Sequence, residues 1–249
     1  MIRAFVFDLD GTLVETEALK ALSYARAAVE LRPDLDEKEI VEAFKDFVGL
    51  SRQEVAVGLM CRFGLEQPAR ERMKEFGVDT PWQAYVQIRL RIYEELLADP
   101  NIVFAHRYPH NIALLRDVRR ERYMTALATQ SHREQARRVL DILGLADEFD
   151  VVVTRDDVEH GKPDPEMHLL AARELGVGPE ECLAIEDSPA GVKGALAAEM
   201  EVVAVTTDLT RQKFRDTDLL DRCHVVDDPR ALPTVVRHLI SIHDQLPGG

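Results

Sequence analysis

The stretch Ile2-Arg3-Ala4-Phe5-Val6-Phe7-Asp8-Leu9-Asp10-Gly11 opens the chain with an apolar run that ends in two carboxylates and a glycine. Phe and Val favour a buried strand, and Gly11 permits a tight turn directly beyond it. Ligands of open parallel sheets bind outside the carboxyl ends of the strands. The stretch therefore predicts a buried strand that brings Asp8 and Asp10 to the functional edge of a sheet.

Three later segments repeat this arrangement, because each is an apolar strand candidate that leads into polar side chains. Residues 123–129 end in Thr129 and are followed by Gln130 and Ser131. Residues 149–153 lead through a short polar segment to Lys162, and residues 182–185 run into Glu186 and Asp187. Together, the four segments supply an acid pair, a hydroxyl, a lysine and a second acid pair.

Strand and helix candidates alternate from Tyr123 to His243, a pattern typical of βαβ units. Helix start signals follow the strands at Ser131-x-x-Glu134, Asp164-Pro165 and Ser188-Pro189. Free N–H groups at these helix ends are expected near one crevice, where they favour an anion. The fold class that we predict is α/β, with a doubly wound and mostly parallel sheet.

The region between the first two strand candidates is predicted to be helical. Start signals occur at Asp36-x-x-Glu39, Ser51-x-x-Glu54 and Thr80-Pro81-x-Gln83. Apolar residues recur there at helical spacing, which indicates ordinary core packing. We therefore predict a core domain formed by residues 1–14 and 99–249, with a helical cap domain inserted as residues 15–98.

In these residues the chain resembles the haloacid dehalogenase (HAD) superfamily, whose motifs are an aspartate pair, a Ser/Thr, a Lys and a terminal acidic pair in this order. The long interval between Asp8 and Thr129 is what a cap inserted after the first motif would produce. The segments 161–165 (GKPDP) and 185–191 (IEDSPAG) are most similar to the β-phosphoglucomutase and phosphoglycolate phosphatase branch. The resemblance implies a Rossmann-like HAD core with a helical cap.

Phosphate monoester chemistry suits two neighbouring carboxylates, since phosphorus must be attacked and the leaving alkoxide needs a proton. We expect Asp8 to be the nucleophile that forms an aspartyl-phosphate, and Asp10 to protonate the leaving oxygen and later activate water. The resemblance implies the same roles. Lys162 is expected to pair with the nucleophile and the phosphate, and Thr129 to hold a nonbridging oxygen.

Crowded carboxylates repel a phosphate unless a cation neutralises them. Mg²⁺ accepts carboxylate, carbonyl, phosphate and water oxygens in octahedral geometry. The predicted ligands are the Asp8 carboxylate, the Asp10 backbone carbonyl and Asp187, with Glu186 as a further candidate, directly or through water.

Substrate contacts are predicted on both domains. Gln130 and Ser131 adjoin Thr129, and the segment 49–52 (GLSR) looks like the turn with which β-phosphoglucomutase grips its substrate's distal phosphate. Arg52 suits bidentate phosphate recognition, with Ser51 beside it. Ser51 fits a helix N-cap equally well, Arg52 a solvated first turn, and Ser131 a cap as well as a ligand.

The predicted function is a Mg²⁺-dependent phosphatase that acts on a small phosphorylated metabolite, plausibly a sugar phosphate. A β-phosphoglucomutase-like mutase is the alternative, disfavoured by Lys20 and Glu15 where the branch usually has His and Asp. A haloacid dehalogenase is disfavoured by Asp10, because a halide leaves without a proton. A phosphometabolite-binding protein of the same fold without turnover stays open.

The composition limits the partners. The net charge of −14, from 45 acidic and 31 basic residues, disfavours binding to nucleic acid or to anionic membrane surfaces. No apolar run approaches the ~20 residues that a membrane span requires, and the N-terminus lacks the features of a secretory signal. We expect a cytoplasmic protein, whose oligomeric state the sequence does not reveal.

Overall fold

The computed structural model describes residues 1–48 and 50–245, so Gly49 of the predicted turn lies outside the described residues. The chain divides into two compact units. The core unit contains Met1–Glu15 and the chain from Val103 onward, whereas the second unit is Thr16–Ile102. All regular elements of the second unit are helices, and we refer to it as the helical unit.

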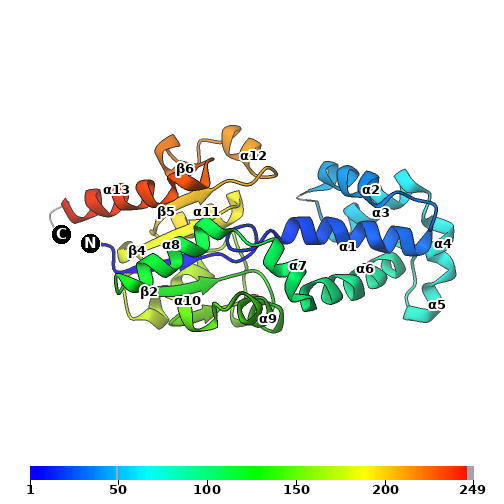
Figure 1. The fold of residues 1–249 in the computed structure, drawn as a ribbon, viewed down its shortest axis with the longest axis horizontal. Coiled ribbons are helices and arrows are strands. Elements are labelled where there is room, and N and C mark those ends of the chain that lie inside the picture. The colour runs from blue at the N-terminus through cyan, green and yellow to red at the C-terminus, as the bar shows by residue number, and fades with distance from the viewer. Residues whose placement is uncertain (49, 246–249) are drawn as a thin grey trace. The chain divides into compact units, whose positions relative to one another are not determined.

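The core unit is built on a six-stranded sheet in which all neighbouring strands are parallel (Figure 1). The strands are β1 (Ala4–Phe7), β2 (Met124–Ala128), β3 (Val151–Val153), β4 (Cys182–Glu186), β5 (Glu201–Val205) and β6 (Val225–Val226). Their order is β3-β2-β1-β4-β5-β6, which places the N-terminal strand in the middle. The predicted α/β fold with a parallel sheet is confirmed.

Helices connect these strands, as parallel pairing requires. Those of the core unit are α8 (Pro109–Arg120), α9 (Arg133–Leu143), α10 (Glu166–Leu175), α11 (Pro189–Ala197), α12 (Arg211–Arg215) and α13 (Leu232–Gln245). Those of the helical unit are α1 (Thr16–Leu31), α2 (Glu37–Phe44), α3 (Arg52–Phe63), α4 (Glu66–Glu71), α5 (Met73–Phe76) and α6 (Pro81–Ala98). The remaining helix, α7 (Pro100–Ala105), spans the boundary between the units.

The two faces of the sheet are filled differently, because successive side chains of a strand alternate between faces. One face is lined by small residues, including Ala4, Val6, Ala126 and Ala184, and packs against apolar residues of α10 and α11. Phe5 and the other aromatic rings of the central strands belong to a separate aromatic group. The small residues allow α10 and α11 to approach the sheet closely, and this proximity matters for the site.

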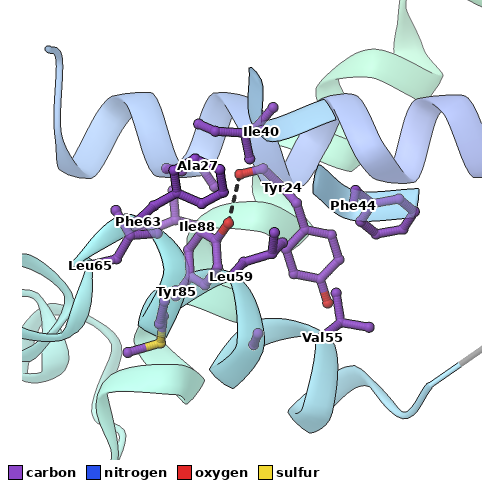
Figure 2. Packing of buried hydrophobic residues seen from close by; sticks show 14 of the residues in the cluster. Tyr24, Ala27, Ile40, Phe44, Val55, Leu59, Phe63, Leu65, Tyr85 and Ile88 are labelled. Atoms are coloured by element: carbon purple, nitrogen blue, oxygen red, sulfur yellow. Dashed lines mark hydrogen bonds between the residues drawn. The ribbon is translucent and has the colours of Figure 1, made fainter. Parts of the chain in front are cut away.

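The helical unit has its own core, in which aromatic and aliphatic side chains of α1, α2, α3 and α6 interdigitate. Figure 2 shows Tyr24 and Tyr85 within this cluster, where the Tyr85 hydroxyl donates to the Tyr24 carbonyl oxygen at 2.8 Å. The bond satisfies a polar atom that would otherwise be buried without a partner.

Most of the helix starts predicted from the sequence are confirmed. Asp36, Ser51 and Thr80 are the N-cap residues of α2, α3 and α6, and Ser51 forms a reciprocal capping box with Glu54. In the core unit, the Ser188 hydroxyl caps α11 by accepting from a backbone N–H. Within residues 1–48 and 50–245, no helix has the length and apolar character that crossing a membrane requires.

Candidate active site

The strand register places three residues at one level of the sheet edge. Phe7 pairs with Leu127 on β2 and with Ile185 on β4, so the next residues are Asp8, Ala128 and Glu186. The Asp8 backbone N–H continues the ladder by donating to the Ile185 carbonyl oxygen at 3.0 Å. Asp8 and Glu186 are both buried, so two carboxylates lie at the ends of adjacent strands in a poorly solvated position.

Lys162 joins these strand ends. Its ammonium lies 2.7 Å from Asp8 Oδ1 and 2.7 Å from Glu186 Oε1, and it donates to the Ala128 carbonyl oxygen at 2.8 Å. The lysine side chain is only 3% exposed. Its three donors therefore meet three acceptors, which fixes the ammonium against the carboxylate predicted to be the nucleophile.

The turn after β1 brings Asp187 into the same group. Gly11 has a φ of +86°, and a Cβ added there would lie 2.1 Å from Asp187 Oδ2. Glycine is thus required both by the backbone conformation and by the space that the Asp187 carboxylate occupies.

Asp10 is held by two hydroxyl groups. Its Oδ2 accepts from Thr129 Oγ1 at 2.9 Å and from Ser131 Oγ at 2.7 Å, while Thr129 Oγ1 accepts from the Ser131 backbone N–H at 3.0 Å. The prediction that Ser131 starts a helix was wrong: α9 begins at Arg133, and its N-cap residue is His132. The Ser131 hydroxyl is instead directed at a carboxylate, because the loop after β2 extends for several residues before α9 begins.

The charges of this cluster do not balance. Burial raises the pKa of Asp8 to about 7, against the opposing effect of Lys162. Burial also raises the pKa of Asp187 well above its usual range, and the charge of Asp8 adds to this effect. Burial also acts on Glu186, but Lys162 and His168 outweigh it and lower the pKa of that carboxyl. Three buried carboxylates thus share one ammonium.

This donor set fits a hard divalent cation. One ligand atom each of Asp8, Glu186 and Asp187 lies within 4.8 Å of the others. All three are carboxylates, the ligand type that Mg²⁺ prefers, and Glu186 Oε2 is buried with no hydrogen-bond partner in the described part of the chain. A cation bound there would supply the positive charge that the three acids lack.

The other predicted substrate contacts are dispersed. Gln130 is exposed, and its Nε2 donates to the Lys162 carbonyl oxygen at 3.3 Å. Ser51 and Arg52 are exposed residues at the start of α3 in the helical unit. The structure therefore gathers Asp8, Asp10, Thr129, Ser131 and the residues of the last two motifs, whereas Ser51 and Arg52 belong to a different unit.

A family model for haloacid dehalogenase-like hydrolases matches residues 2–199. The chain belongs to this family. Among related HAD proteins, the phosphorylated carbohydrates phosphatase of Thermotoga maritima is 30% identical over 201 residues, which are 80% of this chain and 83% of the relative. A T. maritima structure with a provisional β-phosphoglucomutase assignment has a TM-score of 0.71 at 26% identity, covering 96% of this chain and all of that one.

A longer relative matches this chain over part of its own length. The chain is 29% identical over 252 residues to Protein SUPPRESSOR OF QUENCHING 1, chloroplastic, of Arabidopsis thaliana. The match includes the whole of this chain but only 21% of the Arabidopsis protein.

Two buried residues of this HAD protein were not predicted from the sequence. His168 on α10 is fully buried, and its Nε2 lies 2.9 Å from Glu186 Oε1. Arg89 on α6 is 6% exposed, although a guanidinium is rarely buried without a partner. For His168, the only signal in the sequence is its place six residues after Lys162. For Arg89, the sequence gives no sign of burial, because the exposed Arg91 lies in the same helix.

Proposed function

We propose that this chain is a Mg²⁺-dependent phosphatase that hydrolyses a small phosphorylated metabolite, a sugar phosphate, through an aspartyl-phosphate on Asp8. The observation that carries the proposal is the pairing of Lys162 with Asp8 beside an Asp10 carboxyl that two hydroxyl groups orient. The proposed nucleophile, its counter-charge and the proposed acid thus lie together, which supports the proposal. The related phosphorylated carbohydrates phosphatase of T. maritima supports the choice of a sugar phosphate.

In the proposed reaction, an Asp8 oxygen attacks phosphorus and the bond from phosphorus to the ester oxygen breaks. Asp10 gives its proton to that leaving oxygen, so an alcohol departs. Asp10 then takes a proton from water, whose oxygen attacks phosphorus and displaces Asp8 as a free carboxylate. Lys162 offsets negative charge on the nucleophile and on the phosphate throughout.

Mg²⁺ held by Asp8, Asp187 and the Asp10 carbonyl, with Glu186 as a further candidate, would neutralise charge on the phosphate and these acids. Thr129 would offer its hydroxyl to a nonbridging oxygen once Asp10 no longer accepts it. Because both hydroxyl groups point at Asp10, Ser131 is better placed to orient this acid than to cap a helix.

The direct test is phosphate release from a panel of phosphorylated metabolites, with and without Mg²⁺. We expect release from sugar phosphates that requires Mg²⁺. β-Glucose 1-phosphate is included and its isomerisation followed, because the T. maritima neighbour points to mutases as well. Isomerisation without net release would replace the phosphatase by the mutase, and metabolite binding without either reaction would favour a binding protein.

Mg²⁺ is expected to raise the melting temperature more at pH 8 than at pH 5. The folded pKa of Asp8, about 7, exceeds the unfolded value of 3.8, so the metal-free native state holds the extra proton between these values. Stability in EDTA should therefore fall as pH rises from about 4 to about 7. A cation that binds the ionised acids opposes this loss, by about 2.7 kcal/mol at 100 times its Kd.

Differential scanning fluorimetry in EDTA and in Mg²⁺ measures both effects. The matched variant is Asp187→Asn, which should lose most of the Mg²⁺-induced shift while it keeps its fold. An equal shift at pH 5 and pH 8, or an undiminished shift in the variant, would contradict the proposed metal site.

A further inference from the structure

α10 carries a fully buried imidazole behind the lysine of the site. His168 is 0% exposed, and its Nε2 lies 2.9 Å from Glu186 Oε1. Glu186 is two residues beyond Ala184, so the alternation of β4 directs both toward the sheet face that packs against α10. The contact between His168 and Glu186 thus follows from the closeness that the small residues of this face permit.

The contact with Glu186 identifies a ring nitrogen of His168 that carries a proton. Because Nε2 faces a carboxylate, it must carry a proton and donate it. Among the described residues, Nδ1 has no hydrogen-bond partner, and a Cβ added at Gly194 would lie 3.2 Å from it.

Glu186 is consequently fixed by two donors on one oxygen. Its Oε1 meets both Lys162 Nζ, at 2.7 Å, and His168 Nε2. Its Oε2 has no hydrogen-bond partner within residues 1–48 and 50–245, and a Cβ added at Gly191 would lie 1.9 Å from it. If the imidazole donor were lost, Glu186 Oε1 would keep its contact with Lys162 Nζ but lose its contact with His168 Nε2.

We propose that His168 is a positioning residue, which holds Glu186 Oε1 against Lys162 and thereby keeps the ammonium on Asp8. The inference rests on the proposed function, because it concerns the nucleophile of that reaction. His168 touches neither Asp8 nor Lys162 by any hydrogen bond in the described part of the chain, and its effect must pass through Glu186.

The test compares two variants in saturating Mg²⁺. His168→Gln keeps an N–H donor near the position of Nε2, whereas His168→Leu keeps the volume and removes the donor. We expect kcat to fall about 10-fold to 100-fold in His168→Leu, with KM little changed, and to stay within about 3-fold of the native value in His168→Gln. Equal loss in both variants, in proportion to a lower melting temperature, would leave His168 a packing role and overturn the proposal.

A double-mutant cycle with Glu186→Gln shows whether His168 acts through Glu186. We expect His168→Leu to change kcat by less than about 2-fold in the Glu186→Gln background. Additive losses in the double variant would overturn the proposed route through Glu186.

A measurement independent of turnover separates this inference from the proposed function. In ¹⁵N-histidine-labelled protein, the ring resonances of His168, assigned by their absence in His168→Gln, should show a proton on Nε2. An Nε2 that carries no proton would overturn the inference even in an active enzyme. Conversely, an Nε2–H tautomer in a chain that releases no phosphate would refute the phosphatase and leave the buried contact in place.

Discussion

Replacing Asp8 with Asn is expected to reduce phosphate release by about 10⁴-fold or more, because the amide cannot attack phosphorus. The fold should be retained. Asn has nearly the same shape, and the Lys162 ammonium keeps its contacts with Glu186 and the Ala128 carbonyl oxygen. The substitution also removes a carboxyl whose pKa burial raises to about 7, so at pH 8 the variant avoids the burial of an ionised acid.

Phosphate release and thermal melting are measured side by side for this variant. Asp218→Asn is the matched control, because Asp218 is an exposed aspartate outside the site and should keep full activity. Incubation with a labelled substrate should place phosphate on the peptide that contains Asp8 in the native chain only. Release that persists in a clean Asp8→Asn preparation would refute the nucleophile assignment.

The positions of the main site residues follow from the sequence because strand ends are strongly encoded. The apolar run before Asp8 can be buried only as a central strand, and a parallel partner then brings Glu186 to the same edge. Lys162 could be predicted as a partner of Asp8 only through the family resemblance, since a long loop separates it from β3. The ordered motifs therefore carried information that periodicity alone lacks.

The contacts of Ser131 and His168 and the burial of Arg89 could not be predicted from the sequence. A Ser followed three residues later by Glu satisfies a helix-start pattern, but the loop after β2 continues to His132 and turns the Ser131 hydroxyl toward Asp10. The contact made by His168 depends on how closely α10 approaches β4, which no local pattern specifies. Arg89 and Arg91 are two positions apart on one helix, and only the tertiary packing decides which of them is buried.

Replacing Lys162 with Met should both stop turnover and destabilise the core unit. The variant loses the donor that offsets charge on Asp8, which we expect to lower kcat/KM by about 10³-fold. It also leaves Asp8 and Glu186 buried without their cation, and breaking a buried pair in this way costs about 3–5 kcal/mol. Lys193→Met is the control, because Lys193 is an exposed lysine of α11.

The loss of stability in Lys162→Met should depend on pH. Without the ammonium, both carboxyls favour their neutral forms in the folded state, so the native protein holds protons that the unfolded chain releases above about pH 4.5. The deficit in the free energy of unfolding should therefore be larger at pH 8 than at pH 5, as denaturant titrations at the two values would measure. A deficit that is equal at both pH values would indicate lost packing rather than lost charge compensation.

The Lys162→Met variant also tests the proposed metal site. If Lys162 and the metal neutralise the same group of acids, the cation should stabilise Lys162→Met at pH 8 by more than it stabilises the native chain, because it then meets an uncompensated negative site. Comparison of the Mg²⁺-induced melting shifts in the two proteins measures this difference. An identical shift would mean that the metal and the lysine act on separate acids, and Asp8 and Glu186, the acids that Lys162 contacts, would have to be removed from the proposed metal ligands.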